Sequence, residues 1–168
     1  MLINLSDVLT TEGMQISREV MLEMPCFSQG AQSYEILSKS PVTFVFTNTG
    51  EGKARLEGKV SLKVQGACDR CLTPVPVELN LDFGQQEISL QTGLEEGYME
   101  GSCLDTEAFV HNEILVSWPG KILCREDCRG ICPVCGRDLN KGDCGCDTFV
   151  PDPRMAVIQD IFHADKEV

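Results

Sequence analysis

The sequence has few aromatic residues and few cations, and each shortage narrows the functions open to it. Aromatic residues make up 6% of the 168 positions, which does not support binding of single-stranded nucleic acid by stacking bases on aromatic rings. Lys and Arg number 14 against 26 Asp and Glu, for a net charge of −12. Nucleic acid repels such a chain at long range, so an RNA contact needs a local basic patch, and a basic protein partner is favoured.

Histidine is equally scarce. His111 and His163 are the only two, and neither has a nucleophile at a spacing that would pair with it. The sequence also lacks a Gly-rich phosphate loop after a strand and a Gly-x-Ser-x-Gly motif. It has no run of about 18 apolar residues to cross a membrane, and Met1 to Val8 lacks the basic and apolar regions of a secretory signal. We therefore expect a cytoplasmic protein that is not an enzyme, has no small-molecule substrate and enters no membrane.

Cysteine, in contrast, is abundant, and six of the ten cysteines lie between residues 124 and 146. The segment Cys132-Pro133-Val134-Cys135-Gly136 has the spacing of a zinc knuckle, in which both sulfurs reach one ion and glycine supplies the open turn. Metal is favoured over disulfides because a cytoplasmic protein is kept reduced, and because cysteines one residue apart do not bridge easily. The candidate zinc ligands are Cys124, Cys128, Cys132, Cys135, Cys144 and Cys146.

Tetrahedral zinc takes four ligands, so the six tail cysteines exceed what one site needs. Cys132 and Cys135 form the first pair, and we prefer one site over two sites that would use eight cysteines. A shell made only of cysteines leaves no open position for water, so the zinc is expected to be structural. Three pairs can complete the shell, the last of them outside the tail: Cys124 with Cys128, Cys144 with Cys146, or Cys68 with Cys71.

The second Cys-x-x-Cys segment is Cys68-Asp69-Arg70-Cys71. A thioredoxin-like redox pair would need a helix after it, and residues 73–77 are strand-like instead. A metal half-site and a plain structural turn both remain open, because spacing alone does not separate them. Cys26 and Cys103 stand alone and are predicted to be buried apolar side chains.

Alternation of apolar residues predicts an antiparallel sheet with one wet face. It runs through residues 42–46, 56–64 and 75–83, with turn residues at 48–52. The acidic stretch Gln85 to Gly101 is predicted to be a mobile loop. Asp105 is predicted to cap a helix that extends to about Ser117, with a buried stripe made of Phe109, Val110, Ile114 and Leu115.

These elements predict an α+β fold, in which an antiparallel sheet carries flanking helices and a small cysteine-rich zinc-knuckle segment. The sheet domain is expected over residues 1–120, with the Cys-x-x-Cys at 68–71, and the zinc-binding segment over residues 121–150. Asp152-Pro153 begins a final helix over residues 151–168, because proline suits the first helical position. The apolar face of this helix is expected to pack on the sheet domain.

Basic residues recur along the second predicted strand. The odd positions from 53 to 63 share one face of a strand, so their cations would form a stripe on an otherwise acidic molecule. The ordinary interpretation is the solvated face of an amphipathic strand, and the alternative is a surface that contacts RNA phosphates. The candidate RNA-facing residues are Lys53, Arg55, Lys59, Lys63 and, just beyond the strand, Arg70.

Three segments together resemble a known family. They are Cys68-Asp69-Arg70-Cys71-Leu72, the cysteine-rich segment 123–136 with Leu139-Asn140, and Asp152-Pro153-Arg154. In this order and spacing the chain, from about Met1 to its end, resembles the YceD-like family, the large ribosomal RNA subunit accumulation proteins. The resemblance implies a cytoplasmic, non-catalytic bacterial factor that supports normal levels of large-subunit ribosomal RNA.

The resemblance leaves the binding partner open. Ribosomal RNA or a pre-ribosomal particle would meet the basic stripe, and its binding would then weaken steeply with salt. The alternative is an adaptor whose acidic surface engages a basic ribosomal protein or assembly factor without touching RNA. A third hypothesis, a redox-sensing zinc switch, requires the tail to release metal on mild oxidation.

Overall fold

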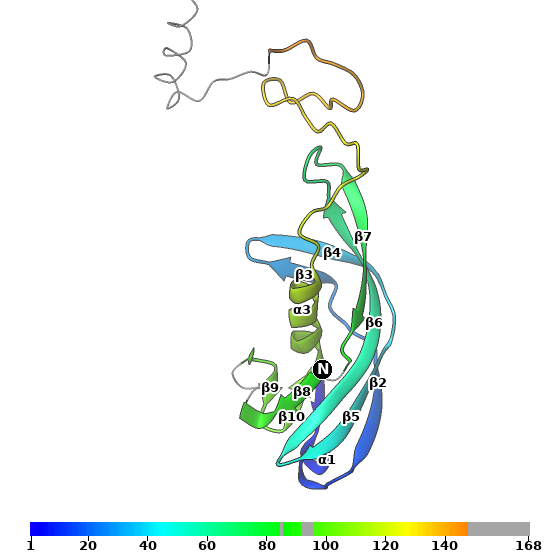
Figure 1. Ribbon diagram of the computed structural model, residues 1–168, viewed down its shortest axis with the longest axis vertical. Coiled ribbons are helices and arrows are strands. Elements are labelled where there is room, and N and C mark those ends of the chain that lie inside the picture. Colours follow the sequence, from blue (N-terminus) through cyan, green and yellow to red (C-terminus); the bar gives the residue numbers. More distant parts are fainter. Residues whose placement is uncertain (85, 92–95, 148–168) are drawn as a thin grey trace, which may run out of the picture. The chain divides into compact units, whose positions relative to one another are not determined.

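The computed structural model describes residues 1–84, 86–91 and 96–147, and Figure 1 shows its elements. The chain divides into two compact units: residues 1–68 with 73–124, and residues 69–72 with 125–168. The strands and helices that the structure describes all belong to the first unit. They are β1 (Leu2–Asn4), α1 (Ser6–Thr10), β2 (Gln15–Val20), β3 (Cys26–Gln29), β4 (Gln32–Lys39), β5 (Val42–Gly50), β6 (Lys53–Ala67), β7 (Pro74–Asp82), β8 (Gln86–Ser89), β9 (Met99–Glu100), β10 (Cys103–Asp105) and α3 (Thr106–Ser117).

The main sheet is antiparallel and is organised around β6, a strand of 15 residues (Figure 1). Along one edge β6 pairs first with β5 and then with β4, and along the other edge it pairs with β8 and then β7. Strand β2 extends the sheet beyond β5, and β3 extends it beyond β4. A smaller sheet, β1-β10-β9, precedes helix α3.

The side chains of β6 alternate as the sequence predicts. Leu56, Val60, Leu62 and Val64 are buried on one face, while the odd positions between them are polar. Gly58 belongs to the buried face, where an added Cβ would lie 2.7 Å from the Thr43 carbonyl oxygen and 3.1 Å from the Phe83 ring. The missing side chain therefore makes room for the aromatic core.

Helix α3 lies against the concave face of the sheet (Figure 1) and contributes Phe109 to the core. The Phe109 ring packs edge-on against Phe83 at 5.2 Å and against Phe44 at 6.1 Å between ring centroids. The carboxylate of Asp105 accepts hydrogen bonds from the N–H groups of residues 107 (3.0 Å) and 108 (3.3 Å), which confirms the predicted cap. Leu115, predicted to be buried, is 38% exposed because it lies off the face that carries Phe109 and Ile114.

The α+β prediction fits in outline, since the described chain is mostly antiparallel sheet with few helices. The prediction of a mobile loop over 85–101 is wrong for the described part of this range. Strands β8 and β9 form there, and they bury Ile88 and Met99. The prediction that Cys26 is buried is also wrong. Its neighbour Phe27 points inward on β3, and because side chains alternate along a strand, Cys26 is exposed. Cys103 is only partly buried.

The helix predicted over residues 151–168 lies outside the described residues. Among the residues that are described, no helix is long and apolar enough to span a membrane.

Candidate metal centres

Eight of the ten cysteines gather into two groups of four. Within each group the four sulfur atoms all lie within 4.8 Å of one another. All ten cysteines are described, and none forms a disulfide. The first tetrad consists of Cys68, Cys71, Cys124 and Cys128, and the second tetrad consists of Cys132, Cys135, Cys144 and Cys146.

The spacing of the sulfurs suits a metal ion. Four sulfurs placed tetrahedrally at about 2.3 Å from one ion lie about 3.8 Å from each other, which both tetrads accommodate. Every donor is a thiol, and soft metals prefer thiolate ligands. Each tetrad could therefore hold one metal ion. The sequence instead favoured a single site that contains Cys132 and Cys135, with the pair that completes it left open.

Both Cys-x-x-Cys segments adopt the same kind of turn. The N–H of Cys132 donates to the carbonyl five residues on, that of Arg137 (2.8 Å), and the N–H of Cys68 donates to that of Thr73 (2.8 Å). The residue after the second cysteine is left-handed in both, with φ +72° at Gly136 and +61° at Leu72. The segment 68–71 thus presents its two sulfurs from the same turn as the knuckle in the tail.

The tail contains a short hairpin between Cys128 of the first tetrad and Cys144 of the second. Residues 130–132 run antiparallel to residues 137–139, with a bridge between Ile131 and Asp138 and hydrogen bonds at either side. The N–H of Cys132 donates to the Arg137 carbonyl, and the N–H of Leu139 donates to the Gly130 carbonyl (2.9 Å). We call residues 128–140 the tail hairpin.

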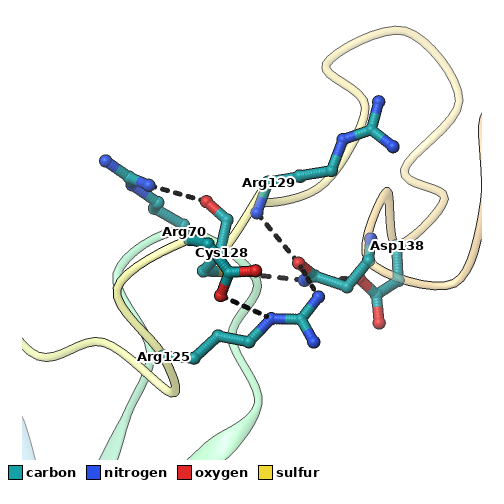
Figure 2. Close-up of polar contacts among 7 residues, drawn as sticks. Arg70, Arg125, Cys128, Arg129 and Asp138 are labelled. Carbon is teal, nitrogen blue, oxygen red and sulfur yellow. Dashed lines mark hydrogen bonds and ion pairs between the residues drawn. The ribbon is translucent and has the colours of Figure 1, made fainter.

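Arg70 attaches its turn to the tail hairpin through two contacts. The N–H of Ile131 donates to the Arg70 carbonyl (3.1 Å), and the Arg70 guanidinium donates to the Cys128 carbonyl (2.6 Å; Figure 2). Gly130, at φ +78°, lets these backbones meet, because an added Cβ would lie 2.9 Å from the Arg70 carbonyl oxygen. Residues 69–72 consequently belong to the same compact unit as the tail.

Asn140 uses its whole amide group beside the first tetrad. Its amide nitrogen donates to the Cys128 sulfur (3.4 Å) and to the Asp138 carboxylate (2.8 Å). Its amide oxygen accepts from the Arg125 guanidinium (2.8 Å) and from the N–H of Arg129 (2.9 Å). In the sequence, Leu139-Asn140 contributes only to the family resemblance, so the contacts of Asn140 were not predicted.

The thiols of the second tetrad differ in acidity. Hydrogen bonds from the backbone of Cys135 and Val134 lower the pKa of Cys132 to about 7, which favours the thiolate that binds metal. Hydrogen bonds with the sulfurs of Cys135 and Cys144 raise the pKa of Cys146 to about 12. Four thiolates in contact repel one another, so the last proton leaves readily only when a cation replaces it.

The basic stripe lies on the polar face of β6, but carboxylates alternate with its cations. Lys53 pairs with Glu87 on β8, at 2.6 Å between nitrogen and oxygen. On β7, Asp82 pairs with Lys59 and Glu78 pairs with Lys63, both at 2.8 Å. These hydrogen bonds lower the carboxyl pKa of Asp82 and Glu78 and raise the amine pKa of Lys59.

The other two candidate cations have different surroundings. Arg55 is exposed on β6, opposite Thr47 on one side and Glu87 on the other. Arg70 lies outside the stripe, on the turn that contacts the tail hairpin. The structure therefore brings four of the five candidate residues onto one face and places the fifth beside the first tetrad.

Comparison with known proteins identifies the family of this chain. The model of the family described as large ribosomal RNA subunit accumulation protein YceD matches residues 56–162. The chain belongs to this family. The match confirms the resemblance and covers the turn at 68–71 and both tetrads; residues 1–55 lie outside it.

The curated relatives are uncharacterized proteins of mycobacteria. Those of Mycobacterium bovis and Mycobacterium tuberculosis are 32% identical over 89 residues, and that of Mycobacterium leprae is 30% identical over 89 residues. Each alignment covers 49% of this chain, and it covers 43% of the M. bovis and M. tuberculosis proteins and 41% of the M. leprae protein. The chain thus spans less than half the length of these relatives. No solved structure matches it.

Proposed function

We propose that this protein is a non-catalytic cytoplasmic factor that supports the accumulation of large-subunit ribosomal RNA during ribosome biogenesis. The observation that carries the proposal is membership of the YceD family, whose description names that role. Two further features bear on how the protein would act: the two cysteine tetrads and the charged face of β6.

We propose that each tetrad binds Zn²⁺. Among the described residues 69–72 and 125–147, the buried side chains are those of Cys128 and Cys132, while Leu72, Ile131 and Val134 are exposed. A segment that buries so little apolar surface needs another source of folding free energy, and structural zinc supplies it. Four sulfur ligands would leave no open position on the ion, so the zinc would cross-link the chain without catalysing a reaction.

For the partner, we propose RNA that binds along the basic stripe. The stripe supports this because Lys53, Arg55, Lys59 and Lys63 share one exposed face of a single long strand, and Arg70 adds a fifth cation on the turn that follows. The ion pairs do not prevent it: ion pairs between solvent-exposed groups contribute little, so phosphates can replace their carboxylates at low cost.

A second candidate is the protein-binding adaptor, and one observation favours it. Three of the stripe's cations already face carboxylates, and the chain carries a net charge of −12. A basic ribosomal protein or assembly factor would then meet a surface whose charge is balanced along β6 and negative elsewhere.

A pull-down with and without nuclease separates the two candidates when it is combined with matched charge variants. The variant Lys59→Glu/Lys63→Glu reverses two cations, whereas Glu78→Gln/Asp82→Asn removes their carboxylate partners and leaves the cations in place. RNA binding predicts that ribosomal RNA is lost from the first variant, enriched in the second and absent after nuclease treatment. Recovery of a basic protein that survives nuclease and ignores both variants would favour the adaptor.

The salt dependence of RNA binding gives the expected size of the effect of Lys59→Glu/Lys63→Glu. Each phosphate contact with a single strand contributes about 0.7 to the slope of log affinity against log salt concentration. Loss of the contacts at Lys59 and Lys63 should therefore reduce the slope by about 1.4. An unchanged slope would exclude these two residues from the RNA surface.

A further inference from the structure

We propose that the tail hairpin and Asn140 couple the two tetrads, so that metal bound at one raises the affinity of the other. The inference rests on the proposed metal binding and goes beyond it, because two separate tetrads need not influence each other. The residues that would carry the coupling, 128–140, all lie within one compact unit.

Asn140 lies between ligands of the second tetrad in the sequence, but its side chain contacts a ligand of the first tetrad. It lies in the loop between Cys135 and Cys144, both of which belong to the second tetrad. Its amide nitrogen, however, donates to the sulfur of Cys128, which belongs to the first tetrad. Any order imposed on this loop by the second tetrad is therefore transmitted to a ligand of the first.

The tail hairpin provides a continuous hydrogen-bonded connection beside this contact. It begins at Cys132, a ligand of the second tetrad, whose N–H donates to the Arg137 carbonyl. It continues through the bridge between Ile131 and Asp138, and ends where the N–H of Arg129 donates to the Asn140 side chain (2.9 Å). Arg129 follows Cys128 directly. The hydrogen-bonded connection therefore runs from Cys132, in the second tetrad, to the residue next to Cys128, in the first.

This arrangement gives coupling a physical basis. A metal ion at either tetrad fixes the backbone of the tail hairpin, and the second ion then binds a segment whose conformational entropy has already been lost. Coupling between binding sites is reciprocal and typically amounts to a factor of about 5 to 150. Hydrogen bonds to a ligand's far side often change metal affinity by about 10- to 100-fold.

An amide at position 140 is what the contacts require. The side chain of Asn140 donates twice and accepts twice, and one of its donors faces the sulfur of Cys128. Asn140→Asp keeps the shape and the accepting oxygen, so the bonds from Arg125 and Arg129 survive. It replaces the donor to Cys128 and Asp138 with a carboxylate oxygen, which the Cys128 thiolate and the Asp138 carboxylate both repel.

A thermodynamic cycle on the full-length, reduced protein tests the coupling. Cobalt(II) affinity of the first tetrad is measured by competition with a chelator, with the second tetrad either intact or disabled by Cys144→Ser/Cys146→Ser. We expect disabling the second tetrad to weaken cobalt binding at the first by at least about 5-fold in the native background. In the Asn140→Asp background the same change should have little effect, which identifies Asn140 as the positioning residue.

Two controls keep the cycle interpretable. Asn4→Asp makes the same change of charge on β1, where the side chain accepts a hydrogen bond from the Ser6 N–H (2.8 Å), and it should preserve the full coupling. Slow hydrogen exchange of the Cys132 and Leu139 amides, which donate across the tail hairpin, should show that the hairpin is intact in Asn140→Asp. The sulfur-to-cobalt absorption of the first tetrad should also shift in that variant, because a hydrogen bond to its sulfur is lost.

The outcomes separate this inference from the proposal beneath it. Two ions per chain, with a first-tetrad affinity that is the same whether or not the second tetrad works, would overturn the coupling and leave metal binding standing. Coupling that persists in Asn140→Asp would overturn the role of Asn140. Fewer than two ions per native chain would overturn the two-site proposal, and the coupling with it.

Discussion

Gly130→Ala should detach the turn at residues 69–72 from the tail hairpin while leaving the sheet intact. Gly130 adopts φ +78°, and a Cβ there would lie 2.9 Å from the carbonyl oxygen of Arg70 and 3.4 Å from its Cβ. That carbonyl accepts the hydrogen bond from the Ile131 N–H. A methyl group at position 130 therefore forces apart the two backbones that this bond joins.

The expected magnitude has two parts. A left-handed conformation costs a residue with a Cβ about 1 kcal/mol more than it costs glycine. Displacing a backbone neighbour to relieve the overlap adds about 1–2 kcal/mol. The sum, about 2–3 kcal/mol, lowers the local opening free energy and should speed exchange of the Ile131 amide hydrogen by about 30- to 150-fold.

Gly13→Ala is the matched control, because it separates strain from overlap. Gly13 has nearly the same φ, +72°, and an added Cβ would meet no atom within 4 Å. This variant should lower stability near its own turn by about 1 kcal/mol and leave exchange at Ile131 unchanged. Both exchange rates are read by NMR or mass spectrometry on the metal-loaded protein.

One result would refute the reasoning. If the Ile131 amide in Gly130→Ala exchanges as slowly as in the native protein, the close approach of Gly130 to Arg70 does not hold the turn. The hydrogen bond from the Arg70 guanidinium to the Cys128 carbonyl, together with the cysteines, would then hold Arg70 in place.

Two further predictions concern metal removal and acid. A chelator should expose residues 121–147 to proteases before the sheet melts, because bound metal contributes folding free energy there; protection that persists after complete metal removal would contradict this. The lysine partners of Asp82 and Glu78 lower the pKa of both carboxyls, so these groups contribute stability above the ordinary carboxylate pKa, and that contribution is lost as the pH falls through the lowered values. Asp82→Asn should therefore lower the thermal midpoint slightly at neutral pH and match the native protein in acid, and an equal difference at both would exclude the ion pair as its cause.

The sheet and its long helix could be predicted because local signals decide them. Alternation along residues 56–64 assigns one face of β6 to the core whichever strands lie beside it. The carboxylate of Asp105 can satisfy the first N–H groups of α3 without any tertiary contact. Strand β8 was missed because it pairs only with β6 and buries one large apolar residue, Ile88, which is too little to show a period.

The ion pairs along the basic stripe were within reach of the sequence. Ala67 pairs with Pro74 across the turn, and counting outward from that pair places Asp82 opposite Lys59 and Glu78 opposite Lys63. Without the position of the turn, the same residues show only that cations repeat on one face of a strand. The interleaved charge is thus a property of the register between two strands, not of either strand alone.

The grouping of the cysteines required tertiary structure. Spacing within the tail cannot distinguish a shell completed by Cys124 and Cys128 from one completed by Cys144 and Cys146. The decisive fact is that Cys68 and Cys71, more than 50 residues earlier, lie with Cys124 and Cys128. The pairing of β6 with β7 forms the turn that carries Cys68 and Cys71, but a spacing rule cannot bring residues 124 and 128 to that turn.

The two Cys-x-x-Cys turns also differ in what maintains them. Gly136 adopts its left-handed φ of +72° without strain, so the turn at 132–137 can form from its own residues. Leu72 adopts φ +61° at a cost of about 1 kcal/mol, and burial offsets little of this cost because 66% of the residue is exposed. The turn at 68–73 must therefore be held from outside, by the contacts of Arg70 with the tail hairpin and by whatever the first tetrad binds. For this reason the sensitive position is Gly130, in a different segment of the chain, and not a residue of the turn itself.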